Sequence, residues 1–256
     1  MGEKPIIFPL HVGTFKKMEM SNLMYQTEPG RKVRTPAISW LIKTTDQNIL
    51  VDTGCPTEEW ASYYHHPIER PDSQTLESQL QHHELRLEDI DTVINTHLHW
   101  DHVHGNDLFP EAVFYVQEEE LKAAVVPLPT QRKYYEAGSP GVYPPWMSSF
   151  GQMRCIQGDY ELTPDIHLIH LPGHTPGLQG VLVDTSNGRY LIAGDTIGVY
   201  ENWSGNKEMP HVPQGIHWNL EDYFRTFKKM ERLEAEVLPA HDFRVLEHAS
   251  FGGDGS

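Results

Sequence analysis

The chain has 256 residues, and its 36 Asp and Glu outnumber its 20 Lys and Arg, which gives a formal net charge of −16. Because nucleic-acid binding draws on Lys and Arg to neutralise phosphates, this balance argues against a nucleic-acid partner. No apolar stretch approaches the roughly 18 residues needed to span a bilayer, and the first residues lack the charged-then-apolar pattern of a secretory signal. We therefore expect a cytoplasmic protein with no nucleic-acid and no membrane partner.

No Pro/Gly/Ser linker, repeat or low-complexity block divides the sequence. Since α/β folds of this length are often single domains, we expect one domain over residues 1–256. The two cysteines, Cys55 and Cys155, allow at most one disulfide, and nothing in the sequence indicates an oxidising compartment. Cys55 is expected to be a small buried residue.

Two early segments carry clear local signals. Residues 39–42 and 48–51 are apolar runs around a polar turn, which predicts two paired strands. Ser73 is predicted to cap a helix whose inner face carries Leu76 and Leu80. Such a helix packs on a sheet more often than it binds a ligand, so these segments are expected to support the fold.

The segment His97-x-His99-x-Asp101-His102 places four potential metal ligands within six residues. It follows an apolar run that predicts a buried strand, and loops that leave a rigid sheet often carry functional groups. Imidazole and carboxylate groups suit Zn²⁺ or a similar divalent ion. A chance cluster is the alternative in a chain with 16 His, and the downstream segments decide between the two.

Three later apolar runs, each predicted to be a strand, end in one more ligand. They are residues 168–171 before His174, residues 190–193 before Asp195, and residues 236–240 before His241. A lone example is more often a structural histidine or a turn aspartate. Four such strand ends in one chain predict a shared metal site.

Two further local signals complete the α/β pattern. Asn187-Gly188 lies between apolar runs at 181–183 and 190–192, which predicts a hairpin because both turn residues tolerate φ > 0. Asn219 is predicted to cap a helix. The apolar positions of that helix follow helical spacing at Leu220, Phe224, Phe227, Met230 and Leu233.

In their order along the chain, the ligands resemble the motif of the metallo-β-lactamase superfamily. Seven positions match in residue type and order, and the resemblance extends from residues 49–54 to residues 241–242. It implies an α/β fold, namely a single-domain αβ/βα sandwich of two mixed β-sheets flanked by helices. Periodicity alone does not select that fold.

The resemblance also implies a dinuclear metal site. One ion would be held by His97, His99 and His174, the other by Asp101, His102 and His241, and Asp195 would bridge them. Two Zn²⁺ are expected, although Co²⁺, Mn²⁺ or Fe²⁺ accept similar ligands. Such ions lower the pKa of a bridging water and supply hydroxide near neutral pH. The free oxygen of Asp101 is then expected to shuttle protons.

Within the superfamily, the sequence is most similar to N-acyl-homoserine lactone lactonases and 4-pyridoxolactonase-like enzymes. Residues 49–54, 158–161 and 171–177 carry this similarity. It implies a quorum-quenching type of hydrolase that opens a small-molecule lactone, often as a homodimer, although no interface can be recognised in the sequence. Asp195 argues against an ordinary β-lactamase. An amide, a cyclic amide or another ester remains an alternative substrate, whereas a phosphodiesterase or a glyoxalase II-like thioesterase is less favoured.

Two positions depart from the lactonase pattern. Where quorum-quenching lactonases usually have Tyr, three residues after the bridging Asp, this chain has Gly198. Tyr200 either reaches the site from a differently shaped loop or is a surface aromatic. His104 stands where the family generally has Gly, and it is either a rim histidine or an extra contact for the substrate.

Two segments are candidates for the wall of a substrate pocket. Residues 10–35 are expected to include an N-terminal loop whose methionines either line an acyl channel or pack in the core. Residues 127–150 are rich in Pro, Gly and aromatics, which is typical of an irregular lid. The expected pocket residues are Met20, Met24, Trp100, His104 and Trp146.

Overall fold

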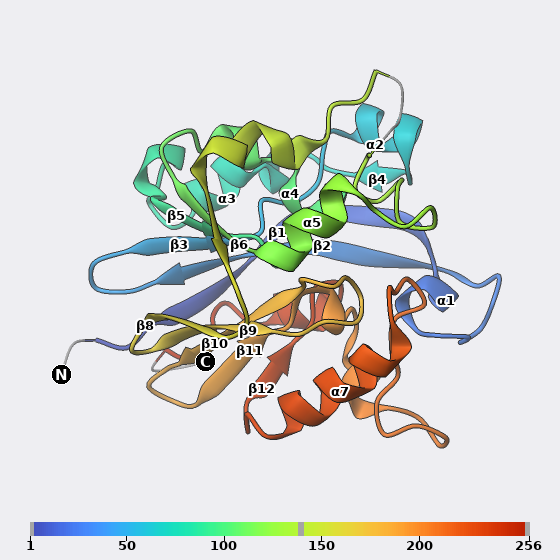
Figure 1. Ribbon diagram of the computed structural model, residues 1–256. Helices are drawn as coiled ribbons and strands as arrows, with labels where there is room; N and C mark the ends of the chain where they lie inside the picture. Colours follow the sequence, from blue (N-terminus) through green and yellow to red (C-terminus); the bar gives the residue numbers. More distant parts are fainter. Residues whose placement is uncertain (1–2, 138–140, 254–256) are drawn as a thin grey trace.

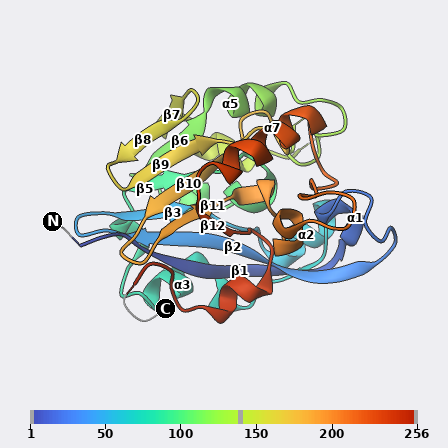
Figure 2. The same cartoon turned by 90° about the horizontal axis from the view of Figure 1, so that it is seen from below.

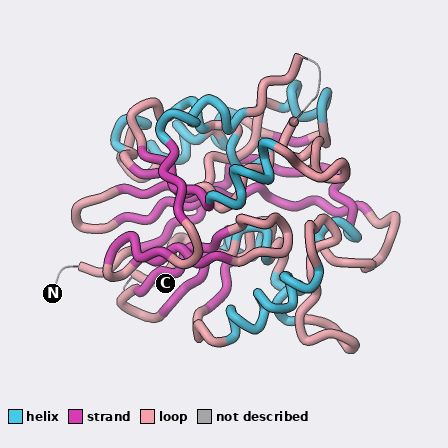
Figure 3. Tube along the Cα trace, in the orientation of Figure 1, coloured by secondary structure: helices cyan, strands magenta, loops and turns pink. Residues whose placement is uncertain are grey.

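The structure is a computed structural model that describes residues 3–137 and 141–253. Its strands form two sheets in the middle of the molecule, and the helices lie outside them (Figure 1; Figure 3). The first sheet has the spatial order β4 (Ile68–Glu69), β1 (Ile6–Glu19), β2 (Lys32–Lys43), β3 (Asn48–Val51), β5 (Thr92–Ile94), β6 (Val113–Gln117) and β7 (Met153–Ile156). The second has the order β12 (Glu236–Leu238), β11 (Arg189–Ile192), β10 (Gln179–Asp184), β9 (Ile166–His170) and β8 (Tyr160–Thr163).

The helices are short and connect or cover the strands. The α-helices are α1 (Met20–Leu23), α2 (Glu58–Tyr64), α3 (Leu76–Gln81), α4 (Trp100–Val103), α5 (Glu118–Val125), α6 (Tyr200–Ser204) and α7 (Leu220–Glu231). The 3₁₀ turns are η1 (Asp72–Gln74), η2 (Leu87–Asp89), η3 (Asn106–Leu108), η4 (Pro145–Gln152), η5 (Gly194–Thr196) and η6 (Phe243–Glu247). Among the described residues, no helix is long and apolar enough to cross a bilayer.

Both sheets mix parallel and antiparallel pairs. Strands β3, β5, β6 and β7 run parallel, whereas β1, β2 and β4 pair antiparallel. In the second sheet only β11 and β12 are parallel. This is the αβ/βα sandwich of two mixed sheets that the resemblance implied.

Alternation along β2 shows how the layers are held together. Ile38 and Trp40 pack in a cluster with Leu168 and Val181 of the second sheet, while Leu41 joins the cluster beneath α3. Successive side chains of a strand point to opposite faces, so one strand serves both layers. Full burial of each such side chain contributes about 1.5–3 kcal/mol to stability.

The second sheet is covered on its outer side by α7 (Figure 2). Asn219 caps this helix, because its side chain accepts hydrogen bonds from the backbone of Glu221 and Asp222. The expected cap is therefore confirmed. The expected apolar face was wrong at Phe224, which is 41% exposed, because the helix turns Tyr223 into the core instead.

Both predicted hairpins are confirmed, by the pairing of β2 with β3 and of β10 with β11. The predicted cap at Ser73 was wrong: α3 begins two residues later than predicted, and Thr75 accepts the capping hydrogen bond from Ser78. Ser73 lies in the preceding 3₁₀ turn η1. Leu76 and Leu80 are buried, as expected.

The N-terminal segment differs from the expected loop. Most of residues 10–35 belong to the long antiparallel pair β1 and β2, and α1 lies between these strands. The pairing is irregular between Phe15 and Met18, where the register shifts. A paired strand satisfies its own backbone hydrogen bonds, so the strand parts of this segment are held in place and residues 24–31 form the connecting loop.

Candidate metal centre

The predicted ligands lie where strands of the two sheets end. His97 and His99 follow β5 directly, His174 lies beyond β9, Asp195 is in η5 after β11, and His241 follows β12. All five are buried. Because the strands are rigid, their ends bring residues far apart in sequence to one place without a flexible linker.

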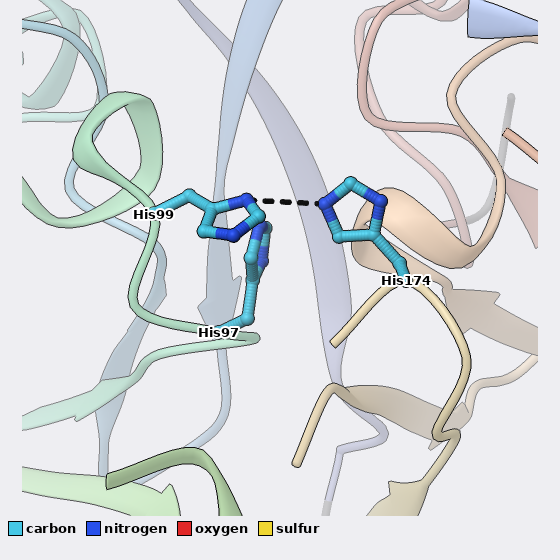
Figure 4. Close-up of side chains that lie close together, drawn as sticks. All are labelled: His97, His99 and His174. Atoms are coloured by element: carbon cyan, nitrogen blue, oxygen red, sulfur yellow. Dashed lines mark hydrogen bonds between the residues drawn. The ribbon is translucent and has the colours of Figure 1, made fainter. Parts of the chain in front are cut away.

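The side chains meet in three overlapping groups. Within each group, one ligand atom of every residue lies within 4.8 Å of the others. The groups are His97, His99 and His174; His97, His102 and Asp195; and Asp101, His102 and His241. Figure 4 shows the first group, in which His99 Nδ1 and His174 Nε2 face each other at 3.1 Å.

The two oxygens of Asp195 face different histidines. Oδ1 lies 3.2 Å from His102 Nε2 and 3.0 Å from His241 Nε2, whereas Oδ2 lies 3.4 Å from His174 Nε2. A carboxylate with its oxygens divided in this way can contact two cations at once.

The donor set fits a metal ion. His97 Nδ1 contacts Thr96 Oγ1 at 3.0 Å, while its buried Nε2 has no hydrogen-bond partner among the described residues. A buried nitrogen without a partner is unfavourable in a folded protein, and a metal ion would satisfy it. Imidazole and carboxylate donors together suit zinc and similar divalent ions. The residues present therefore form a site suitable for metal binding.

Asp52 orients the ring of His102 through a contact with its Nδ1 atom. Its Oδ2 lies 2.7 Å from His102 Nδ1, and its oxygens also accept hydrogen bonds from the backbone N–H and the hydroxyl of Thr96, both at 2.7 Å. Asp52 has φ of +58°, a strained conformation that tends to persist at functional sites. Because Nδ1 of His102 donates to Asp52, Nε2 is left free to bind a metal.

Two other histidines are oriented by backbone carbonyls. His174 Nδ1 donates to the carbonyl of Ile216 at 2.8 Å, and His241 Nδ1 donates to that of Pro36 at 2.9 Å. A carbonyl oxygen only accepts, so the proton must reside on Nδ1 in both rings. Their Nε2 atoms face Asp195 in the centre, where they can bind a metal ion.

Burial and charge set the protonation of these groups. Burial lowers the pKa of His97 and His99 well below its usual range, and the neighbouring imidazoles add to this effect. Burial also opposes charge on His102, but the carboxylates of Asp195 and Asp101 outweigh it and raise its pKa. Burial would raise the pKa of Asp195, yet the surrounding histidines hold it well below its usual range. The carboxylate is therefore ionised and ready to bind cations.

Glu120 at the start of α5 connects two of the ligand segments. Its carboxylate accepts hydrogen bonds from Leu98 N–H at 2.9 Å, Gly177 N–H at 3.1 Å and the Tyr135 hydroxyl at 2.8 Å. Leu98 lies between two ligands, and Gly177 is in the turn that carries His174. A Cβ at position 177 would come within 2.1 Å of the Glu120 backbone nitrogen, so this close approach requires glycine. Sequence analysis did not single out Glu120, which resembles a surface acid in an acidic helix turn.

A cavity opens over the centre. Its wall consists of Met18, Asn22, Leu23, His66, His99, Trp100, Asp101, Tyr134, His174, Asp195, Gln214, Ile216 and His241. Five of the seven predicted ligands thus line the cavity, where a bound molecule could contact them. A second, neighbouring groove shares Leu23 and His241 with it and contains Met20 and Met24.

Comparison with known proteins identifies the family. Residues 34–241, more than half of the chain, match the family model described as the metallo-beta-lactamase superfamily. The chain belongs to this superfamily. Its ligand pattern and its two mixed sheets therefore have a common explanation, and the chain is a metallo-hydrolase.

Several members of the superfamily are similar to it over most of their length. An N-acyl homoserine lactonase of Bacillus cereus is 28% identical over 198 residues, which are 73% of this chain and 74% of the lactonase. A solved structure of a Bacillus thuringiensis AiiA variant, with N-decanoyl-L-homoserine bound at its active site, has a TM-score of 0.75 at 23% identity and covers 96% of both chains. AidC, a dizinc quorum-quenching lactonase solved with its product, has a TM-score of 0.64 at 18% identity and covers 94% of this chain and 88% of AidC.

The predicted pocket residues of this metallo-hydrolase lie in different places. Trp100 is in the cavity wall, as expected, and Met20 and Met24 lie in the neighbouring groove. Trp146 is outside both and packs in a separate core cluster with Tyr135. It lies in η4, so the lid predicted at 127–150 is partly a helical turn; residues 138–140 lie outside the described residues.

His104 and Tyr200 also lie outside both cavities. The ring of His104 packs edge-on against Trp60 with ring centroids 4.8 Å apart, and burial lowers its pKa to about 4. Tyr200 lies against the guanidinium of Arg244, 4.8 Å from the ring centroid, and its backbone N–H donates to Asp242 at 3.1 Å. The structure therefore does not bring the Tyr200 hydroxyl to the cavity, and it makes His104 a packing residue.

Sequence analysis missed several cavity residues, among them His66 and Gln214. His66 follows α2, and Gln214 lies in the long connection between α6 and α7. Neither has a local sequence signal, because each reaches the cavity only through the packing of distant segments. Tyr134, from the segment predicted as a lid, is also in the wall, and its backbone carbonyl accepts a hydrogen bond from Trp100 N–H at 2.9 Å.

Proposed function

We propose that this metallo-hydrolase is a dinuclear zinc lactonase that opens the ring of N-acyl-homoserine lactones. The observation that carries the proposal is the placement of Asp195, whose two oxygens face His174 on one side and His102 with His241 on the other. This arrangement supports a carboxylate that bridges two ions. The similarity to lactonases over most of the chain supports the choice of substrate.

His97, His99 and His174 would hold one zinc ion, and Asp101, His102 and His241 the other. A pair of ions supplies hydroxide near neutral pH and polarises a carbonyl group. The protein itself orients the ligands through Asp52, Ile216 and Pro36. Co²⁺, Mn²⁺ and Fe²⁺ accept the same kinds of ligand. Among these ions, we propose zinc.

Asp101 is proposed to move the proton. It lies in the cavity wall, its side chain is 13% exposed, and its Oδ2 is 3.8 Å from His102 Nε2. Ring opening needs a proton on the leaving alkoxide, and a carboxylate that binds through one oxygen can deliver it with the other. Trp100 and Leu23 contribute apolar surface to the wall of the same cavity.

The neighbouring groove is proposed to take the acyl chain. It contains Met20 and Met24 beside Leu23, Val33 and Val199 and adjoins the cavity at Leu23 and His241. Methionine side chains adapt to flexible apolar ligands, so chains of different length can be accommodated. Hydrolysis of an amide or cyclic amide is the second candidate. Its basis is that this chain has Gly198 where lactonases usually have Tyr, and that Tyr200 lies outside the cavity and does not replace it.

The test is proton release from N-decanoyl- and N-hexanoyl-homoserine lactone, measured with zinc-loaded and chelator-treated protein. Already opened N-decanoyl-homoserine provides the blank. Rapid release that needs zinc, with two zinc ions per chain by elemental analysis, is the expected result. Lactones that stay closed while an amide panel is hydrolysed would instead favour the second candidate.

We further propose that residues 1–256 fold as one domain, that the protein is cytoplasmic, and that it forms a homodimer. Limited proteolysis, cell fractionation and light scattering test these three points. A monomer by light scattering at micromolar concentration would reject the dimer without affecting the site.

A further inference from the structure

The side-chain amide of Gln214, in the wall of the cavity, has an unpaired NH₂ group. Gln214 is 2% exposed, and its Nε2 has no hydrogen-bond partner among the described residues. It shares the cavity wall with Asp195 and His241. Since buried polar groups are nearly always hydrogen-bonded, an unpaired amide at this place indicates a partner that enters the cavity.

The amide occupies the space over Gly198. A Cβ on Gly198 would come within 2.7 Å of Gln214 Nε2, so even alanine would push the amide away. The Gly198 carbonyl accepts a hydrogen bond from the backbone N–H of His241 at 2.8 Å, which fixes this strand end beside a ligand. The absence of a side chain at Gly198 therefore leaves the space that the Gln214 amide occupies.

The segment that carries Gln214 is held on both sides. Gly215 N–H donates to the carbonyl of Asn22 at 2.9 Å, and the next carbonyl, that of Ile216, accepts from His174 Nδ1 at 2.8 Å. A Cβ at Gly215 would come within 1.7 Å of a backbone oxygen in α1, so the contact requires glycine. The backbone next to Gln214 is thus held between α1 and the His174 ring before any substrate binds, which favours a preorganised donor.

We propose that Gln214 contacts the substrate and donates an amide N–H to the carbonyl oxygen of the scissile ester. The ester group of a lactone has only acceptor oxygens, so of the two ends of the amide it can pair with the NH₂ group alone. A donor at this place also stabilises the negative charge that develops on that oxygen when hydroxide attacks. The inference rests on the proposed lactonase function and adds the residue that supplies the donor.

The first test compares Gln214→Leu with the wild type on N-decanoyl-homoserine lactone. Leucine keeps much of the volume but removes the donor, so kcat should fall about 100-fold, as for the loss of one oxyanion donor, while KM changes far less. Gln214→Glu, which keeps the shape without the N–H, should lose as much. Zinc content and melting temperature, measured on every variant, should stay at wild-type values.

Gln152→Leu is the matched control. Gln152 lies outside the cavity, where its amide donates to the backbone carbonyls of Phe109, Pro110 and Ala112. This variant also replaces a glutamine amide by an apolar side chain, and it breaks more hydrogen bonds within the protein than Gln214→Leu does, yet its kcat and KM should equal those of the wild type. A loss of activity in Gln152→Leu as large as in Gln214→Leu would make the effect one of stability and overturn the inference.

The second test is a double-mutant cycle with Gly198→Ala. Because the added Cβ displaces the amide, Gly198→Ala should lose activity, and Gly198→Ala/Gln214→Leu should be no worse than Gln214→Leu alone. Effects that multiply would show that the two residues act independently. Gln214→Leu within threefold of the wild type, with lactone opening intact in both, would reject the inference and leave the proposed function standing.

Failure of the proposed function gives a different pattern. If the wild type opens no lactone but hydrolyses p-nitrophenyl acetate, the same variants are compared on that ester, where the 100-fold loss in Gln214→Leu is again expected. A wild type inert towards all lactones and towards p-nitrophenyl acetate would overturn both proposals.

Discussion

Asp52 and His102 form the contact that most directly links the fold to the metal centre. Asp52 ends the hairpin of β2 and β3, His102 lies in α4, and their Oδ2 and Nδ1 atoms are 2.7 Å apart. Both side chains are almost fully buried. Because the contact decides which nitrogen of His102 carries the proton, it also decides which nitrogen is left for a metal ion.

Replacing Asp52 with Asn should weaken metal binding. Asparagine also tolerates the positive φ at this position, so the turn is retained, but the charge that orients His102 is lost. We expect an about 10- to 100-fold lower zinc affinity in titrations against a competing chelator. Asp107→Asn, at an exposed aspartate, is the control and should bind zinc like the wild type. Equal affinities in both variants would show that Asp52 has no part in holding the ion.

Removal of the carboxylate at Asp195 should disrupt the proposed pair of zinc ions. Asp195→Ala leaves His174, His102 and His241 without the oxygens that lie between them. We expect zinc content to fall from two ions to one per chain and kcat/KM to fall by more than about 100-fold. Far-UV circular dichroism should show an unchanged fold. Two bound ions together with full activity would remove Asp195 from the bridging position.

Glu120 should matter for stability more than any surface acid. Glu120→Ala leaves the N–H groups of Leu98 and Gly177 buried without their acceptor and opens a cavity. We expect the free energy of unfolding to fall by about 3 kcal/mol in urea titrations. Glu120→Gln keeps one acceptor oxygen and should cost clearly less. A loss below about 1 kcal/mol in the alanine variant would contradict the role assigned to this carboxylate.

Glu136 should make stability depend on pH. Burial and the nearby charge of Asp101 raise the pKa of Glu136 from 4.5 to about 8, and its Oε1 contacts His65 Nε2 at 2.6 Å. Between these two pH values the folded state holds a proton that the unfolded state has lost, so stability decreases as pH rises. The wild type should therefore lose stability relative to Glu136→Gln from pH 4.5 to 8. Parallel pH profiles of the two unfolding free energies would show that Glu136 is ionised in the folded state.

Tyr200→Phe should leave catalysis unchanged. The hydroxyl of Tyr200 lies outside both the cavity and the groove, and the ring packs against Arg244. We expect kcat/KM for N-decanoyl-homoserine lactone to stay within twofold of the wild type. A 10-fold loss would mean that the loop rearranges to bring Tyr200 to the substrate.

Local sequence determined several of the elements and the order of the candidate ligands along the chain. The Asn187-Gly188 turn fixes the β10–β11 hairpin, because its length and backbone preference leave few alternatives. The ligands could be predicted because each directly follows a short apolar strand. Strand ends are placed by the sheet, so residues 97–102, His174, Asp195 and His241 converge once the two sheets form.

Only the tertiary structure decided which other side chains reach the cavity. Met20 and Met24 face a groove beside it, Tyr200 turns away, and Gln214 enters from a connection with no local signal. A turn or a helix cap depends on a few adjacent residues, whose preferences can be read from the sequence. The cavity wall depends on how segments far apart in the sequence pack, from Met18 to His241, and that packing is set by the shape of the whole core.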